Sequence, residues 1–204
     1  TASDDVEATR AYSQQALRVS WLLVLAMVSV LGAGGHELVT MLFGDVYGPA
    51  SKALIPMSLA AACLALTYLM GTMLIAADQA RDAVVVVALV SLGQMVGLHL
   101  LMGQSDAGPS GLHVASYIVC VAGILGLFVA GFVTHRRLGV QPPWLALGRG
   151  ALGCAVALLS VAWIDLHPIV TIFVRPGIAA VVFVVVCVMT NELTAKDLSL
   201  IRST

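Results

Sequence analysis

The chain has 204 residues, of which 60% are hydrophobic and only 10% are charged, and its mean hydropathy is +1.00. About a quarter of the residues in a soluble domain are usually charged, so this chain has too few charges to cover a water-soluble globule. Its formal net charge of −1 does not favour a nucleic-acid partner. The composition predicts a chain whose solvent is the lipid bilayer.

The first ten residues, TASDDVEATR, are acidic and lack the basic region that precedes the apolar core of a signal peptide. We therefore expect residues 1–18 to form a cytoplasmic lead-in helix rather than a cleaved leader. We interpret the chain as a piece that begins partway through a longer protein.

Six apolar runs follow, each of about the length that a helix needs to cross a bilayer, roughly 17–25 residues. They are Val19–Gly35, Leu54–Ala77, Ala83–Met102, Leu112–Thr134, Trp144–Ile164 and about Arg175–Thr190. Runs such as AVVVVALV do not alternate as barrel strands do, and a helix satisfies its backbone polar groups within the segment. The fold class is therefore predicted to be all-α, a polytopic integral membrane bundle of six transmembrane helices over residues 19–190.

Basic residues predict the orientation of these spans. With both termini in the cytoplasm, eight of the ten basic residues lie on the inner side, and only Lys52 and Arg175 lie on the outer side. The segment LFGDVYGPASKAL, residues 42–54, then falls at the outer face as an interfacial turn that anchors two helices. Residues 191–204 are expected to form a cytoplasmic tail, with Thr194 and Asp197 starting a short amphipathic helix.

Polar groups follow the first span. Gly32, Gly34 and Gly35 end its apolar run and are candidates for a bend. His36 and Glu37 come next and are expected at the outer boundary, where they are hydrated or form a proton relay.

The second and third spans carry further candidates. Tyr68 belongs to a stripe of small or weakly polar residues that either packs on a neighbouring helix, which we favour, or faces a cavity. Gln94 either lines a cavity or makes a hydrogen bond between helices. His99, about 140° around the helix from Gln94, is a separate candidate proton carrier. Gly93 and Gly97 form a GxxxG spacing that favours close helix packing.

Aromatic and cationic side chains lie at several span edges. Trp21 and Trp144 are expected at the membrane interface. Arg149 is expected to extend to the inner interface, and Arg149 and Arg175 are the two span-edge candidates for binding a diphosphate headgroup.

The four cysteines, Cys63, Cys120, Cys154 and Cys187, all lie in apolar runs without metal-ligand spacing. We expect no disulfide, no metal and no cofactor. The chain also lacks an H-x-x-x-x-D pair and a D-x-D motif, so we do not expect a membrane-bound transferase.

The run Leu42-Phe43-Gly44-Asp45-Val46-Tyr47, the span that begins at Leu54, the inner AADQARDA and the tail NELTAKDLSLIR follow one another in a distinctive order. In this order the chain resembles the C-terminal half of polysaccharide flippases, members of the multidrug/oligosaccharidyl-lipid/polysaccharide superfamily. The resemblance extends over nearly the whole chain, from about Ala16 to Arg202.

The resemblance implies four helices of a second lobe, similar to that of multidrug transporters, plus two appended helices in a bacterial cytoplasmic membrane. It implies a polyprenyl-diphosphate-linked oligosaccharide as cargo, and membrane lipid and the N-terminal lobe of the same transporter as partners. Two alternatives are a drug or cation antiporter of the same superfamily and a non-transporting partner of polysaccharide assembly. The antiporter normally needs acidic residues deep in the bundle, whereas every Asp and Glu here is expected in a loop, a tail or a span edge.

Overall fold

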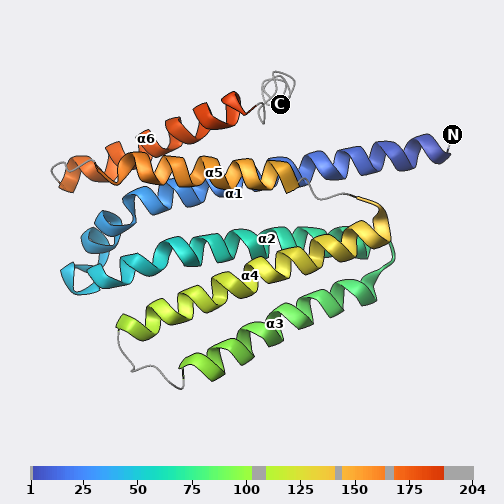
Figure 1. Cartoon of the computed structure of the whole chain (residues 1–204), viewed down its shortest axis with the longest axis horizontal. Helices are drawn as coiled ribbons and strands as arrows, with labels where there is room; N and C mark the ends of the chain where they lie inside the picture. Colours follow the sequence, from blue (N-terminus) through green and yellow to red (C-terminus); the bar gives the residue numbers. More distant parts are fainter. Residues whose placement is uncertain (1, 103–108, 141–143, 164–167, 191–204) are drawn as a thin grey trace.

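A computed structural model describes residues 2–102, 109–140, 144–163 and 168–190, and in these ranges the chain is helical, without strands (Figure 1). The elements are α1 (Ala2–Phe43), the 3₁₀ helix η1 (Asp45–Ala53), α2 (Leu54–Ala76), α3 (Ala80–Met102), α4 (Pro109–Leu138), α5 (Trp144–Val161) and α6 (Pro168–Met189). Within the described ranges, six helices are long and apolar enough to cross a membrane. The predicted all-α, multi-pass membrane bundle is confirmed.

Prolines and left-handed residues set several helix ends. Pro109 and Pro168 are the first residues of α4 and α6, a position that proline suits because it needs no hydrogen-bonded N–H. The starts expected at Leu112 and Arg175 were therefore too late. Asp78, with φ 61°, turns the chain between α2 and α3, and Gly139, with φ 66°, ends α4.

Helix α1 is much longer than the first predicted span. Its 42 residues extend about 63 Å, twice the roughly 30 Å of a bilayer core, and its N-terminal part projects beyond the other helices in Figure 1. The lead-in expected over residues 1–18 and the first span are one continuous helix. The amphipathic tail helix expected over residues 191–204 lies outside the described residues.

Helix α1 lies between two groups of helices. On one side it packs against α5 and α6, which pack on each other, and on the other side it packs against α2. Helix α2 in turn packs on α4, and α3 lies at the far edge against α2 and α4 (Figure 1). Since α1 is the element that contacts both groups, its side chains determine how the groups meet.

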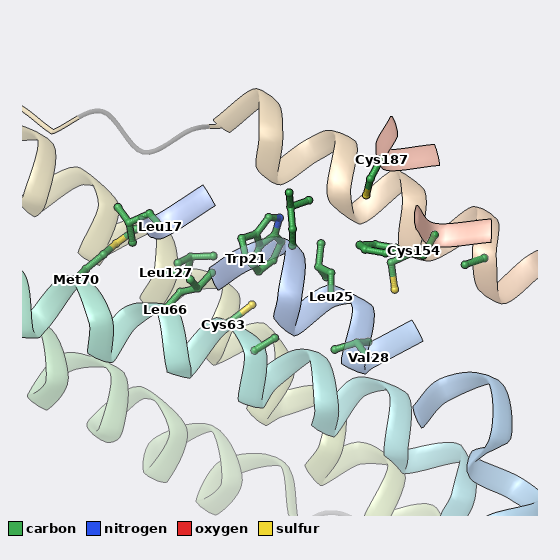
Figure 2. Packing of buried hydrophobic residues seen from close by; sticks show 14 of the residues in the cluster. Leu17, Trp21, Leu25, Val28, Cys63, Leu66, Met70, Leu127, Cys154 and Cys187 are labelled. Atoms are coloured by element: carbon green, nitrogen blue, oxygen red, sulfur yellow. The ribbon is translucent and has the colours of Figure 1, made fainter. Parts of the chain in front are cut away.

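The core is centred on one face of α1. Its buried side chains recur every three or four residues, and Figure 2 shows them between side chains of α2 and of α5 and α6. These side chains are Leu17, Trp21, Leu25 and Val28. Trp21 was expected at the membrane interface, but it is only 5% exposed and its Nε1 donates to the Leu147 carbonyl of α5 at 3.1 Å. A tryptophan buried between helices needs such an acceptor for its N–H.

The glycines of α1 admit the neighbouring helices. A Cβ at Gly32 would lie 2.8 Å from Leu158 of α5, and one at Gly34 would lie 2.7 Å from Pro176 of α6. A Cβ at Gly35 would lie 3.0 Å from Leu54 of α2. The helix runs through all three glycines to Phe43, so the end of the apolar run at Gly35 is not the end of the helix. Because these three positions have no side chains, α5, α6 and α2 can all approach α1 closely within two turns of its length.

Candidate functional site

A short ion pair joins α1 to α6. Arg175 Nη1 lies 2.6 Å from Glu37 Oε1, and the two side chains are only 17% and 12% exposed. Both residues lie inside candidate membrane spans, and Glu37 is about 9 Å along the helix from the end of α1 at Phe43. This is therefore a largely buried ion pair between two helices that are candidate membrane spans.

The close approach of the two helices explains why this pair forms. Pro176 packs on Gly34, three residues before Glu37, and so places the adjacent Arg175 beside the carboxylate. Pro176 also lacks the N–H that would bond to the Ile172 carbonyl, and this carbonyl oxygen lies 3.7 Å from the position of a Cβ at Gly34. Because Gly34 has no side chain, there is room beside it both for the proline ring and for the Ile172 carbonyl, which lacks its usual partner within the helix.

One oxygen of Glu37 is not satisfied by the pair. Its Oε2 is buried and makes no hydrogen bond to any residue in the part of the chain that the structure describes. A buried carboxylate oxygen without a donor is unfavourable, since the oxygen has lost its water. Glu37 Oε2 can therefore accept a hydrogen bond from a ligand or from water.

The outer turn forms a second contact to α1, next to the first. Gly44, with φ 87°, allows the chain to leave α1, and η1 then folds back so that Gly48 packs near His36 and Thr40. Ser51 Oγ donates to the Gly48 carbonyl at 2.7 Å and lies 3.0 Å from His36 Nδ1. Because the hydroxyl proton is already used, His36 Nδ1 must carry a proton and donate to Ser51. The LFGDVYGPASKAL segment is thus a turn fastened to the helix that precedes it.

These contacts change the expected surroundings of two residues. Glu37 was expected hydrated at the membrane boundary, but it is largely buried and paired. Arg175 was expected at the start of a span, but it lies inside α6. Both differences arise because α1 and α6 are longer than the apolar runs alone suggested. His36, which precedes Glu37 in the sequence, has an exposed side chain on α1.

The candidates of the second and third spans lie elsewhere. Tyr68, 57% exposed, lines a groove of about 340 Å³ between α2 and α3. Gln94 is half-buried on α3, and its Nε2 has no hydrogen-bond partner among the described residues. His99 is exposed on the same helix. Because α3 packs on α2 and α4, these residues are not brought together with Glu37 and Arg175.

Basic side chains gather at the opposite end of the bundle. Arg149 Nη1 lies 3.4 Å from the Thr190 carbonyl just after α6, and the Arg10 guanidinium lies against Gly139 after α4. Arg137 Nε of α4 pairs with Asp82 Oδ2 of α3 at 2.6 Å, and the side chains are 53% and 21% exposed. This end, on the right in Figure 1, holds the N-terminus of α1 and the turn between α2 and α3. We call it the basic end.

Sequence reasoning missed two of these contacts. The Asp82–Arg137 pair was not anticipated, although the alternation of spans puts both residues at one end. The Glu37–Arg175 pair joins residues 138 positions apart, and no local pattern indicates it.

Comparison of the chain with models of protein families, with curated proteins and with solved structures found no match.

Proposed function

We propose that this chain is one half of a transporter that flips a polyprenyl-diphosphate-linked oligosaccharide across the bacterial cytoplasmic membrane for cell-surface polysaccharide synthesis. Its partners would be the other lobe of the same transporter, the membrane lipid and the lipid-linked glycan. The two lobes would expose a central cavity alternately to either side of the membrane, as in other transporters built from helix bundles. The order of motifs in the sequence supports this family.

The observation that carries the proposal is the Glu37–Arg175 ion pair. Charged side chains in membrane spans are expensive, and where they occur they mark substrate pathways, proton relays and voltage sensors. This pair holds α6 on α1 at one end, whereas Trp21 holds α5 on α1 further toward the basic end. An ion pair with one unsatisfied oxygen is a contact that a change of state can break without disrupting the apolar core.

The gathering of arginines at one end supports the proposed orientation. Positively charged segments are retained in the cytoplasm, so the basic end would face the cell interior. The N-terminus of α1 lies at this end in Figure 1, and η1 lies at the other end. Both termini would then be cytoplasmic, and the interfacial turn would be external.

Deletion of the gene tests the function directly. We expect lipid-linked glycan to accumulate on the inner leaflet, and complementation with the unaltered gene to restore export. Complementation with Glu37→Gln or Arg175→Gln should fail, while Asp45→Asn, which changes an exposed carboxylate in η1, should restore export. Normal glycan export after deletion would contradict the proposal.

The non-transporting alternative makes a different prediction in the same strains. A structural partner of a glycan polymerase would co-purify with that enzyme, and its loss would shorten the polymer without trapping lipid-linked glycan on the inner leaflet. The position of the trapped intermediate therefore separates the two functions.

A drug or cation antiporter is a second candidate because of Glu37. Glu37 is an acidic residue that is largely buried between two candidate membrane spans, which is the kind of residue that such an antiporter uses. Its pairing with Arg175 makes it a weak cation ligand, so the flippase remains our proposal. Proton-driven efflux of a cationic dye from vesicles, abolished by Glu37→Gln, would favour the antiporter.

A further inference from the structure

Two cavities lie along the pair of helices at the edge of the bundle, α3 and α4. The larger is an open groove of about 580 Å³. Apart from Tyr117, its lining is aliphatic or glycine, and it includes Leu89 and Gly93 of α3 and Val121 and Leu125 of α4. The groove therefore suits a hydrocarbon chain rather than a polar ligand.

Glycines determine where the two helices touch and where they leave space. A Cβ at Gly97 would lie 2.8 Å from Ile118, and one at Gly126 would overlap Val90, so these positions bring the helices together. Gly93 is different, because nothing lies within 4 Å of the position of its Cβ. The expected GxxxG contact is therefore made by Gly97 alone, and Gly93 keeps the groove open.

The smaller cavity, of about 430 Å³, lies nearer the basic end of the same helices and is charged. It is lined by Asp82, Phe132, Val133, Arg136 and Arg137. Arg137 is neutralised by Asp82, whereas Arg136 is exposed and forms no ion pair within the described ranges. This basic pocket thus offers one uncompensated guanidinium, a group that binds phosphate well.

The groove and the basic pocket follow one face of α4. Leu125, Val129, Phe132 and Arg136 are three or four residues apart, so they succeed one another along the helix. Leu125 and Val129 line the groove, and Phe132 and Arg136 line the basic pocket. An apolar path along the helix therefore ends at a cation.

We infer that α3 and α4 bind a phosphate-headed polyisoprenoid lipid, with the phosphate at Arg136 and the chain in the groove. The choice of a polyisoprenoid rests in part on the proposed function, since that lipid carries the glycan. The length of the site is an independent reason. From Arg136 to Val114 at the far end of the groove is about 33 Å along α4, whereas one leaflet supplies only about 15 Å of hydrocarbon.

The binding experiment uses the full-length protein in nanodiscs of zwitterionic lipid and a polyprenyl phosphate that carries a photoreactive group on its chain. We expect crosslinks to α3 and α4, and their yield at limiting probe should fall about tenfold in Gly93→Leu and in Arg136→Ala. Gly93→Leu fills open space in the groove. Arg136→Ala removes the phosphate ligand.

Matched variants control for the substitutions themselves. Gly148→Leu also places a side chain in open space, but on α5, and Arg81→Ala removes an exposed arginine that is not in the pocket. Both should keep the unaltered yield. If Gly93→Leu does not fold, Val121→Trp fills the same groove from α4.

Competition distinguishes the possible occupants. Unlabelled polyprenyl phosphate should displace the probe at concentrations where phosphatidylglycerol does not, and equal competition by phosphatidylglycerol would overturn the inference in favour of an ordinary membrane lipid. Crosslinks confined to α5 and α6 would overturn it, as would a dimer that occludes the groove and is lost in Gly93→Leu. The assay contains no glycan, so a lack of crosslinks to α3 and α4 in the unaltered protein, together with export that depends on the gene, would refute this site alone. Normal export after gene deletion would refute the proposed function alone.

Discussion

Substitution of Glu37 or Arg175 is the most direct test of how a buried charge is stabilised in this bundle. Each charge is largely out of water, so its partner is what makes burial tolerable. The Asp82–Arg137 pair has the same 2.6 Å separation but a much more exposed arginine. These two ion pairs of the described ranges thus have equal length in different surroundings, so one serves as the control for the other.

We predict that Glu37→Gln lowers the free energy of unfolding by about 3 kcal/mol, because it leaves the Arg175 charge buried without its counter-ion. A double-mutant cycle with Arg175→Gln should give a coupling of about 1–3 kcal/mol. The cycle of Asp82→Asn with Arg137→Gln should give about 0.5 kcal/mol, since water screens that pair. Titration with sodium dodecyl sulfate in lipid bicelles measures all six variants, and equal coupling in the two cycles would contradict the burial that we assign to the first pair.

The neighbouring helices pack closely on α1 at its glycines. Helix α5 packs at Gly32, α6 at Gly34 and α2 at Gly35. Among the side chains that contact these glycines, Pro176 of α6 is the most rigid. Without a hydrophobic driving force between helices in lipid, close packing of this kind supplies much of the association energy.

We predict that Gly34→Ala destabilises the bundle by about 1–3 kcal/mol, because the new methyl group meets a proline ring that cannot change rotamer. Gly148→Ala is the matched control, since its Cβ enters open space and alanine favours a helix more than glycine does. It should be neutral or slightly stabilising in the same titration. A stabilising Gly34→Ala would show that α6 does not pack on α1 at this position.

The number and class of helices were predictable because apolar length and the alternation of basic residues are local properties of the chain. The helix ends were less so. Helix α6 begins at Pro168 because proline suits the first turn, and the short apolar run before Arg175 continues through that charged residue into the rest of the helix. The surroundings of Trp21 and Glu37 were not predictable, because each depends on the approach of a helix more than 100 residues away. His36 was expected to be hydrated and its side chain is exposed, but its hydrogen bond to Ser51 could not be foreseen without the fold of η1.

As a whole molecule, the bundle has a basic end and an end that carries η1, and every proposal made for it depends on which side each end faces. Cysteine labelling in intact cells measures this orientation directly. The four native cysteines are buried, and they are first replaced by alanine so that only the introduced cysteine can react. Lys52→Cys in η1 and Arg136→Cys at the end of α4 are both exposed and suitable as probes. The account predicts that a membrane-impermeant maleimide labels Lys52→Cys in intact cells and Arg136→Cys only after permeabilisation. Labelling of Arg136→Cys from outside, or of both positions from the same side, would contradict it.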